Sequence, residues 1–158
     1  MQVNEIKLSQ SLAILEYLEV EYPEPPLLPA DPAGKATVRQ LALTVACDIH
    51  PLNNLRVLKY LSEQLGVSED AKIKWINHWI TKGFEALEVM LAGSPSRGRF
   101  SYGDKPTIAD CCLVPQMFNA ARFGVPLDPY PTLRKIEAEC LSVSAFAEAH
   151  PSKQPDAE

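Results

Sequence analysis

The sequence predicts a nearly all-helical fold in a single domain. Apolar residues recur every three or four positions along most of the chain, which is the spacing of amphipathic helices. Proline and glycine separate these stretches, and no alternation of strand and helix patterns follows residue 11. The length of 158 residues suits one hydrophobic core, so we expect one helical bundle whose sequential helices are antiparallel.

The first helix is expected over residues 12–21, where Leu12, Leu15 and Leu18 share one face. The segment before it, residues 3–11, could form one short strand or else a frayed terminus. One strand cannot stand alone, and this chain does not obviously supply a partner for it.

A proline-rich stretch separates the first two helices. Residues 23–31 are expected to form a stiff, extended linker. Asp31 and Pro32 are a favourable N-cap and first helical residue, so the second helix should begin there. Pro51 interrupts the apolar pattern of that helix and is expected to kink it, and Gly66 should end it.

Three further helices are expected after this break. Ser68 should cap a long helix that Gly93 ends. Thr107 should open the next helix, which runs to about Phe123, and Pro131 should start a short one. Because the connections are short, these helices favour antiparallel packing in one bundle.

The acidic balance of the chain argues against two classes of partner. The formal net charge is −5, which disfavours binding to nucleic acid and to anionic membrane surfaces. No apolar run approaches the roughly 18 residues of a membrane helix. The first ten residues, MQVNEIKLSQ, lack the apolar stretch of a signal peptide. We therefore expect a cytoplasmic protein that binds neither nucleic acid nor membrane.

The four cysteines indicate neither a disulfide framework nor a metal site. None belongs to a CxxC pair, so reduced and mostly buried thiols are expected at Cys47, Cys111, Cys112 and Cys140. Cys47 and His50 stand three apart, but a structural zinc site needs about four ligands and no second pair exists. We expect no metal.

Five stretches of the sequence resemble those of one family. They are SQSLAILEYLE, PPLLPADP, ACDIHPLNNLRVLKYL, FSYGDKPTIADCCLVPQ and ARFGVPLDPYP, and they occur in order along nearly the whole chain. Together they resemble zeta-class glutathione transferases, and more narrowly the bacterial maleylacetoacetate and maleylpyruvate isomerases. Members of that family have a thioredoxin-like half followed by an all-helical half.

The resemblance implies an all-α fold, namely the helical bundle of the C-terminal half of a glutathione transferase. A short N-terminal remnant of the thioredoxin-like domain, one possible strand plus one helix, would occupy residues 1–22. The linker at residues 23–31 would lead to the helical domain at residues 32–150, followed by a tail at residues 151–158. The family's N-terminal motif that activates the glutathione thiol does not match any part of this sequence, so no catalytic residue is expected in this chain.

The resemblance also implies a glutathione site. Gln10 and Ser11 match the pair that holds the γ-glutamyl end, and His50 and Asn54 match polar positions of the cleft. Ser11 at a helix N-terminus suits an anion, although Ser11 could also be a plain N-cap. His50 and Asn54 are four apart and would share a helical face, or they could be solvated polar groups at a bend.

Two arginines are implied as ligands of substrate carboxylates. Arg122 matches a cleft-facing arginine and suits bidentate binding, but it could equally interact with its own helix dipole. Arg56 would face a carboxylate or a partner chain. Thr107 and Asp110 match the family's helix-capping motif, and we interpret them as a folding element.

The function implied is glutathione-dependent cis–trans isomerisation of a small dicarboxylic acid. As a single chain the protein is expected to be inactive or weakly active. The alternative is a stand-alone, non-catalytic helical module for binding or oligomerisation. The expected partners are glutathione, a small dicarboxylate, and a second copy or another protein that covers an exposed apolar face.

Overall fold

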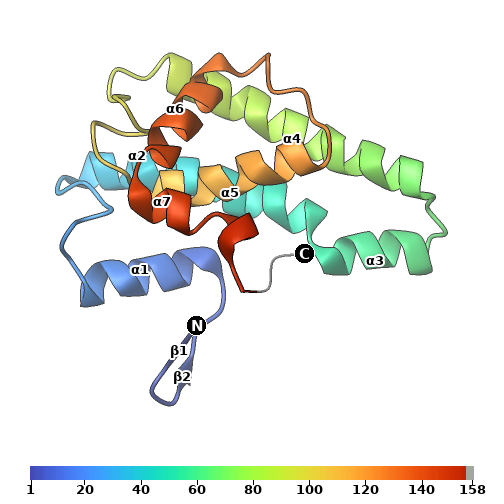
Figure 1. Ribbon diagram of the computed structural model, residues 1–158, viewed down its shortest axis with the longest axis horizontal. Helices are drawn as coiled ribbons and strands as arrows, with labels where there is room; N and C mark the ends of the chain where they lie inside the picture. The colour runs from blue at the N-terminus through green and yellow to red at the C-terminus, as the bar shows by residue number, and fades with distance from the viewer. Residues whose placement is uncertain (156–158) are drawn as a thin grey trace.

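The computed structural model describes residues 1–155 of the chain. Within that range a helical bundle follows a small N-terminal hairpin (Figure 1). The α-helices are α1 (Ser11–Glu21), α2 (Pro32–Leu43), α3 (Leu55–Glu63), α4 (Glu69–Ala92), α5 (Ile108–Arg122), α6 (Pro131–Leu141) and α7 (Ser144–Glu148). The strands are β1 (Gln2–Val3) and β2 (Ile6–Lys7). Three short turns of other helix types are η1 (Thr44–Ile49), η2 (His50–Asn53) and η3 (Pro151–Lys153).

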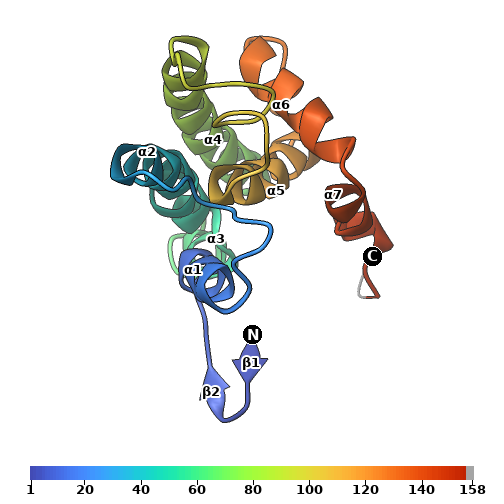
Figure 2. The same ribbon diagram turned by 90° about the vertical axis from the view of Figure 1, so that its left-hand side faces the viewer.

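The N-terminal segment shows that the prediction of an all-α fold with one possible strand is wrong. β1 and β2 form a two-stranded antiparallel sheet, in which Gln2 lies opposite Lys7 and Val3 opposite Ile6. Asn4 makes the turn with a φ of 52°, a left-handed conformation that asparagine tolerates. The strand therefore pairs within its own segment, in a hairpin that projects away from the bundle (Figure 2).

The core lies between α2, α4, α5 and α6. These helices bury their apolar faces against one another, and the buried side chains include Val38, Phe84, Leu113, Met117 and Ile136. The long helix α4 packs against α6 and against η1. Ser68 caps α4 by accepting a hydrogen bond from the Ala71 amide at 3.3 Å.

The chain between α2 and α3 breaks the helix more extensively than the single kink expected at Pro51. The last turn of α2 widens into the π-helical turn η1, and η2 then tightens to a 3-10 turn. Asn54 is extended, with a ψ of 145°, before α3 begins. The Trp75 indole donates a hydrogen bond of 2.8 Å to the Leu52 carbonyl at the break. The spacing of His50 and Asn54 predicted that they share one face of a continuous α-helix. They do not, because the helix is interrupted between them.

The chain after α7 is ordered as far as the structure describes it. His150 packs edge-on against Phe118, and the Gln154 side chain donates to the Glu148 carbonyl at 3.0 Å. Residues 156–158 of the expected tail lie outside the described residues. Within residues 1–155, no helix is both long enough and apolar enough to cross a membrane.

Candidate functional site

The first turn of α1 begins without a side-chain cap. Gln10 occupies the N-cap position with a φ of 73°, and Ser11 is the first helical residue. No side chain within residues 1–155 accepts a hydrogen bond from the first-turn amides, while both Gln10 and Ser11 are exposed. Ser11 is thus not the N-cap that the alternative interpretation expected. The free amides and the helix dipole together form a site suited to an anion.

The bend between α2 and α3 carries the second pair of candidates. His50 is exposed at the start of η2, and Asn54 is half-buried at the N-cap of α3. The Asn54 Oδ1 accepts a hydrogen bond from the Arg56 amide at 3.1 Å, so this oxygen is used to cap α3. The Asn54 Nδ2 and the His50 ring are the groups that can still bind a ligand.

Two exposed arginines supply positive charge. Arg56 lies in the first turn of α3, and Arg122 is the last residue of α5. The Arg122 guanidinium lies 5.9 Å from the centroid of the Phe123 ring. Neither arginine takes part in the ion pairs formed among residues 1–155, so both remain available to a carboxylate.

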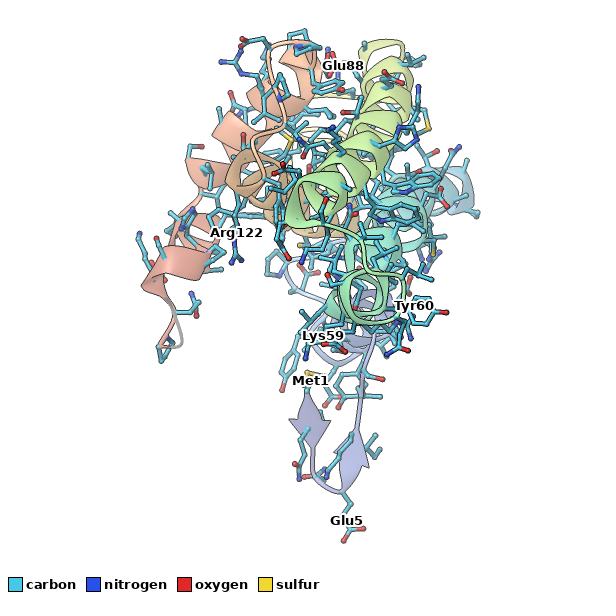
Figure 3. The ribbon with its side chains drawn as sticks, turned by 90° about the vertical axis from the view of Figure 1, so that its right-hand side faces the viewer. Met1, Glu5, Lys59, Tyr60, Glu88 and Arg122 are labelled. Carbon is cyan, nitrogen blue, oxygen red and sulfur yellow. The ribbon has the colours of Figure 1, made fainter. Side chains whose placement is uncertain are left out.

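These candidates come from the ends of three elements. The bend after α2 and the C-terminus of α5 lie toward the right of Figure 1, and the N-terminus of α1 lies nearer the middle, below them. Figure 3 views the molecule from the right-hand side of Figure 1, with Arg122 and the α3 residue Lys59 labelled. Among residues 1–155, the only hydrogen bond or ion pair between two candidates of the glutathione and carboxylate sets is the one between Asn54 and Arg56. The described part of the chain therefore does not join the candidates into a bonded cluster.

Helix α1 is joined to the bundle by an ion pair that the sequence did not reveal. Arg39 of α2 donates two hydrogen bonds to the Glu16 carboxylate, from Nε at 2.6 Å and from Nη2 at 2.9 Å. These bonds lower the pKa of Glu16, burial opposes them, and the nearby charges of Arg39 and Lys35 add to the lowering. The pair is 23 residues apart in sequence, so no local pattern could have indicated it.

A second polar contact holds the linker to α1. The Glu19 carboxylate accepts hydrogen bonds from the amides of Leu27 at 2.8 Å and Leu28 at 3.1 Å. The Leu27 carbonyl in turn accepts from the amide of Ile108, the first residue of α5, at 3.0 Å. A continuous series of hydrogen bonds therefore connects α1 with α5.

The start of α5 is built around a buried carboxylate. Asp110 accepts hydrogen bonds from the Ser101 amide at 2.9 Å, the Thr107 amide at 2.7 Å and the Thr107 hydroxyl at 2.8 Å. Asp110 is completely buried, and these donors compensate for the loss of water. Thr107 and Asp110 thus close the N-terminus of α5 and face no open surface.

Three thiols near Asp110 are poor nucleophiles. Burial, reinforced by the negative charge of Asp110, raises the pKa of Cys111 to about 12 and that of Cys112 to about 11. The same causes raise the pKa of Cys140. These thiols stay protonated near neutral pH, so none of them supplies a reactive thiolate.

One buried polar residue of the bend was missed. Asn53 is only 8% exposed, and neither atom of its side-chain amide has a hydrogen-bond partner among residues 1–155. Its neighbour Asn54 caps α3 instead. The sequence offers two adjacent asparagines, and local preference alone could not show which one caps the helix and which one is buried.

Comparison with known proteins identifies close relatives, although no family model matches the chain. The chain is 53% identical to the maleylpyruvate isomerase of a Ralstonia species over 149 residues, which cover 94% of this chain and 70% of that protein. It superposes with a TM-score of 0.97 on a holo maleylpyruvate isomerase, a bacterial zeta-class glutathione S-transferase. The two are 50% identical, and the match covers 100% of this chain and 74% of the other.

A third similar protein is the maleylacetoacetate isomerase of Anaeromyxobacter dehalogenans 2CP-1, whose structure holds dicarboxyethyl glutathione and citrate in the active site. It is 47% identical with a TM-score of 0.89, and the match covers 96% of this chain and 68% of that one. These superpositions also correct the fold prediction. The prediction set an all-α bundle apart from a remnant at residues 1–22, whereas the whole chain follows the backbone of a zeta-class structure, of which the match covers 74%.

Proposed function

Because the chain belongs to the zeta-class glutathione transferases of the maleylpyruvate and maleylacetoacetate isomerase type, we propose that it serves a glutathione-dependent cis–trans isomerisation. The substrate would be a small dicarboxylic acid with a cis double bond. Bound glutathione would supply the thiol that adds to that double bond, allows rotation and leaves again. The observation that carries the proposal is the uncapped N-terminus of α1, which offers free amides to an anion.

Glutathione would bind with its γ-glutamyl carboxylate at this helix terminus. The first-turn amides and the Ser11 hydroxyl would donate hydrogen bonds to the carboxylate, and the Gln10 amide would orient the rest of the γ-glutamyl group. His50 and the Asn54 Nδ2 would contact the tripeptide from the bend. The glutathione derivative bound by the Anaeromyxobacter dehalogenans isomerase supports the choice of ligand.

The substrate carboxylates would bind to Arg122 and Arg56. Both guanidinium groups are exposed and free of ion pairs within residues 1–155, and arginine binds carboxylates in a bidentate manner. Their positive charge would also stabilise negative charge that develops on the substrate during rotation. The dicarboxyethyl group and the citrate in the Anaeromyxobacter dehalogenans structure support an acidic substrate.

The comparisons give no support to an inactive chain or to a non-catalytic module. Each relative described above is an isomerase by name, and each match covers at least 94% of this chain. Association with a second copy of the chain remains a prediction. Leu55 is 65% exposed and Tyr60 57% exposed on α3, and apolar side chains of this size are commonly covered in an assembly.

A calorimetric titration tests the proposal. Glutathione should bind the purified chain, and Arg122→Gln should leave this binding intact while weakening the binding of maleate about tenfold. Arg134→Gln is a matched control, because Arg134 is an exposed arginine of α6 that already pairs with Asp128. A wild-type chain that binds no glutathione would refute the proposed function.

A further inference from the structure

We propose that Glu19 and the Glu16–Arg39 ion pair are positioning residues. They fix α1 against the bundle and thereby set the distance between the glutathione-binding helix terminus and the rest of the site. The inference rests on the proposed function for its ligand. It concerns residues that lie outside the candidate site and touch neither glutathione nor substrate.

The apolar contacts of α1 are too few to fix its orientation. No residue of α1 is buried, whereas α2, α4, α5 and α6 each bury several side chains. Only Leu12 and Leu15 of α1 reach the core, and both are half-buried. A single apolar contact line of this kind permits rocking of the helix, so directional polar contacts must define its angle.

The first directional contact joins α1 to α2. The Arg39 guanidinium donates hydrogen bonds to both carboxylate oxygens of Glu16, at 2.6 and 2.9 Å. A planar bidentate contact of this kind restricts orientation as well as distance. Glu16 lies five residues after Ser11, which is about 8 Å along the helix axis. Arg39 belongs to the same continuous run of chain that leads into the bend with His50. The pair therefore relates the helix terminus to the bend.

The second directional contact joins α1 to α5. Glu19 accepts hydrogen bonds from the amides of Leu27 and Leu28, and the Leu27 carbonyl accepts one from the first amide of α5. Leu28 is buried in the core, which anchors this part of the linker. Since Arg122 lies at the other end of the rigid helix α5, Glu19 relates the helix terminus to the proposed carboxylate ligand.

An exposed ion pair without a positioning role would behave differently. The Glu16 and Arg39 side chains are each more than a third exposed, so screening by water keeps their direct contribution to stability small. Removal of such a pair would change neither ligand binding nor the local dynamics of α1. The proposal predicts a change in both with little change in global stability.

The experiment combines amide hydrogen exchange with glutathione titration on the full chain. Arg39→Gln and Glu19→Gln should each accelerate exchange in residues 11–21 about tenfold relative to residues 108–122 and weaken glutathione binding about tenfold. In turnover assays the KM for glutathione should rise about tenfold while kcat stays within about twofold. Melting temperatures should stay within about 3 °C of the wild type.

Three further variants separate positioning from charge and from damage to the fold. Arg39→Lys keeps the charge but loses the fork, and should show an intermediate effect. The charge-swapped double variant Glu16→Arg with Arg39→Glu should recover most of the affinity for glutathione. The pair Arg134→Gln with Asp128→Asn removes a comparable exposed contact of 2.9 Å on α6 and should change neither readout.

Two outcomes overturn the inference, and they differ from failure of the proposed function. If Arg39→Gln and Glu19→Gln bind glutathione as the wild type does, the residues do not position the site. If amide exchange in residues 11–21 of these two variants equals that of the control pair, Arg39 and Glu19 do not fix α1 either. This exchange measurement can be made even on a chain that does not bind glutathione. Absence of binding in the wild type alone refutes the ligand.

Discussion

At the scale of single residues, Asp110 shows how a buried charge is maintained in this fold. Its carboxylate is completely removed from water, yet three donors from Ser101 and Thr107 satisfy its oxygens. The same charge, together with burial, raises the pKa values of the neighbouring thiols. One residue thus orders the start of α5 and makes the surrounding cysteines unreactive.

We expect Asp110→Asn to destabilise the protein by about 3 kcal/mol, because the neutral amide replaces charge-assisted hydrogen bonds and turns one acceptor into a donor. Urea unfolding monitored by circular dichroism measures the loss. Asp128→Asn is the control, since the Asp128 side chain is 94% exposed, and it should change stability by less than about 0.5 kcal/mol. Equal effects of the two substitutions would contradict the structural role of Asp110.

The thiols should differ sharply in reactivity toward Ellman's reagent. With a pKa of about 12, Cys111 has a thiolate fraction of only about 1 in 10,000 at about pH 8, and Cys112 and Cys140 are buried. Cys47 is exposed and should be the one thiol that reacts rapidly in the native chain. Cys47→Ser should abolish the rapid phase, and all remaining thiols should react after denaturation. A second rapid thiol in the Cys47→Ser variant would contradict this assignment.

At the scale of secondary-structure elements, α4 and the π-helical turn η1 approach each other at a glycine. A Cβ atom at Gly83 would collide with the side chain of Ile49, which is completely buried. The missing side chain of Gly83 lets Ile49 pack directly on the backbone of α4. This close approach holds the start of the bend that carries His50.

Gly83→Ala should therefore destabilise the chain by about 2 kcal/mol, although alanine has the better helix propensity. Thermal unfolding measures the change, and Gly83→Ala should cost less in an Ile49→Ala background, where the colliding side chain is absent. Gly93→Ala serves as the control, because its Cβ would meet only the Val89 carbonyl oxygen at 3.4 Å. Stabilisation by Gly83→Ala would show that the contact can relax and would refute the argument.

The elements show which parts of the fold local chemistry can predict. Asp31 before Pro32, and Ser68 and Thr107, cap helices at the positions where their sequence indicates a helix start. The π and 3-10 turns at the bend depend instead on Ile49 packing at Gly83 and on a hydrogen bond from Trp75, both distant in sequence. The hairpin was missed because strands of two residues are too short to show alternation.

The candidate site, like the fold, was predictable in its local features but not in its contacts between distant residues. Residue types and family resemblance suggested the polar residues at the start of α1, at the bend and at the end of α5. Sequence could not show that Gln10, with a positive φ, leaves the first turn of α1 uncapped. Nor could it show that Arg39 would reach Glu16, because that contact exists only once α1 has packed against the bundle.

At the scale of the whole molecule, the chain has two parts that are held in place by different interactions. The bundle is held by a continuous apolar core, whereas α1 with its hairpin is held by two half-buried leucines and by carboxylate contacts. Apolar packing does not depend on pH, but carboxylates lose their acceptor character when they are protonated. The two parts should therefore respond differently to acid.

We predict that acid releases α1 before the bundle unfolds. The bonds from Arg39 hold the pKa of Glu16 below its ordinary value of 4.5, so the folded state binds this proton less readily than the unfolded chain does. The contribution of the pair is thus fully present above pH 4.5 and is lost as the pH falls through the folded pKa below it. Lys35 and Arg39 are the cations that face this carboxylate, and Glu19 lies one turn further along α1.

NMR amide signals of residues 11–21 should broaden or shift as the pH is lowered from about 6 to about 3, while the fluorescence of Trp75 and Trp79 in α4 stays native over the first part of the titration. Glu16→Gln is the matched variant. It should loosen α1 already at about pH 6, and the step that involves α1 alone should become smaller as the pH is lowered, because the Glu19 contacts remain. If α1 and the two tryptophans instead respond with a single shared midpoint in the wild type, α1 is an inseparable part of the bundle. The polar contacts would then not determine its position.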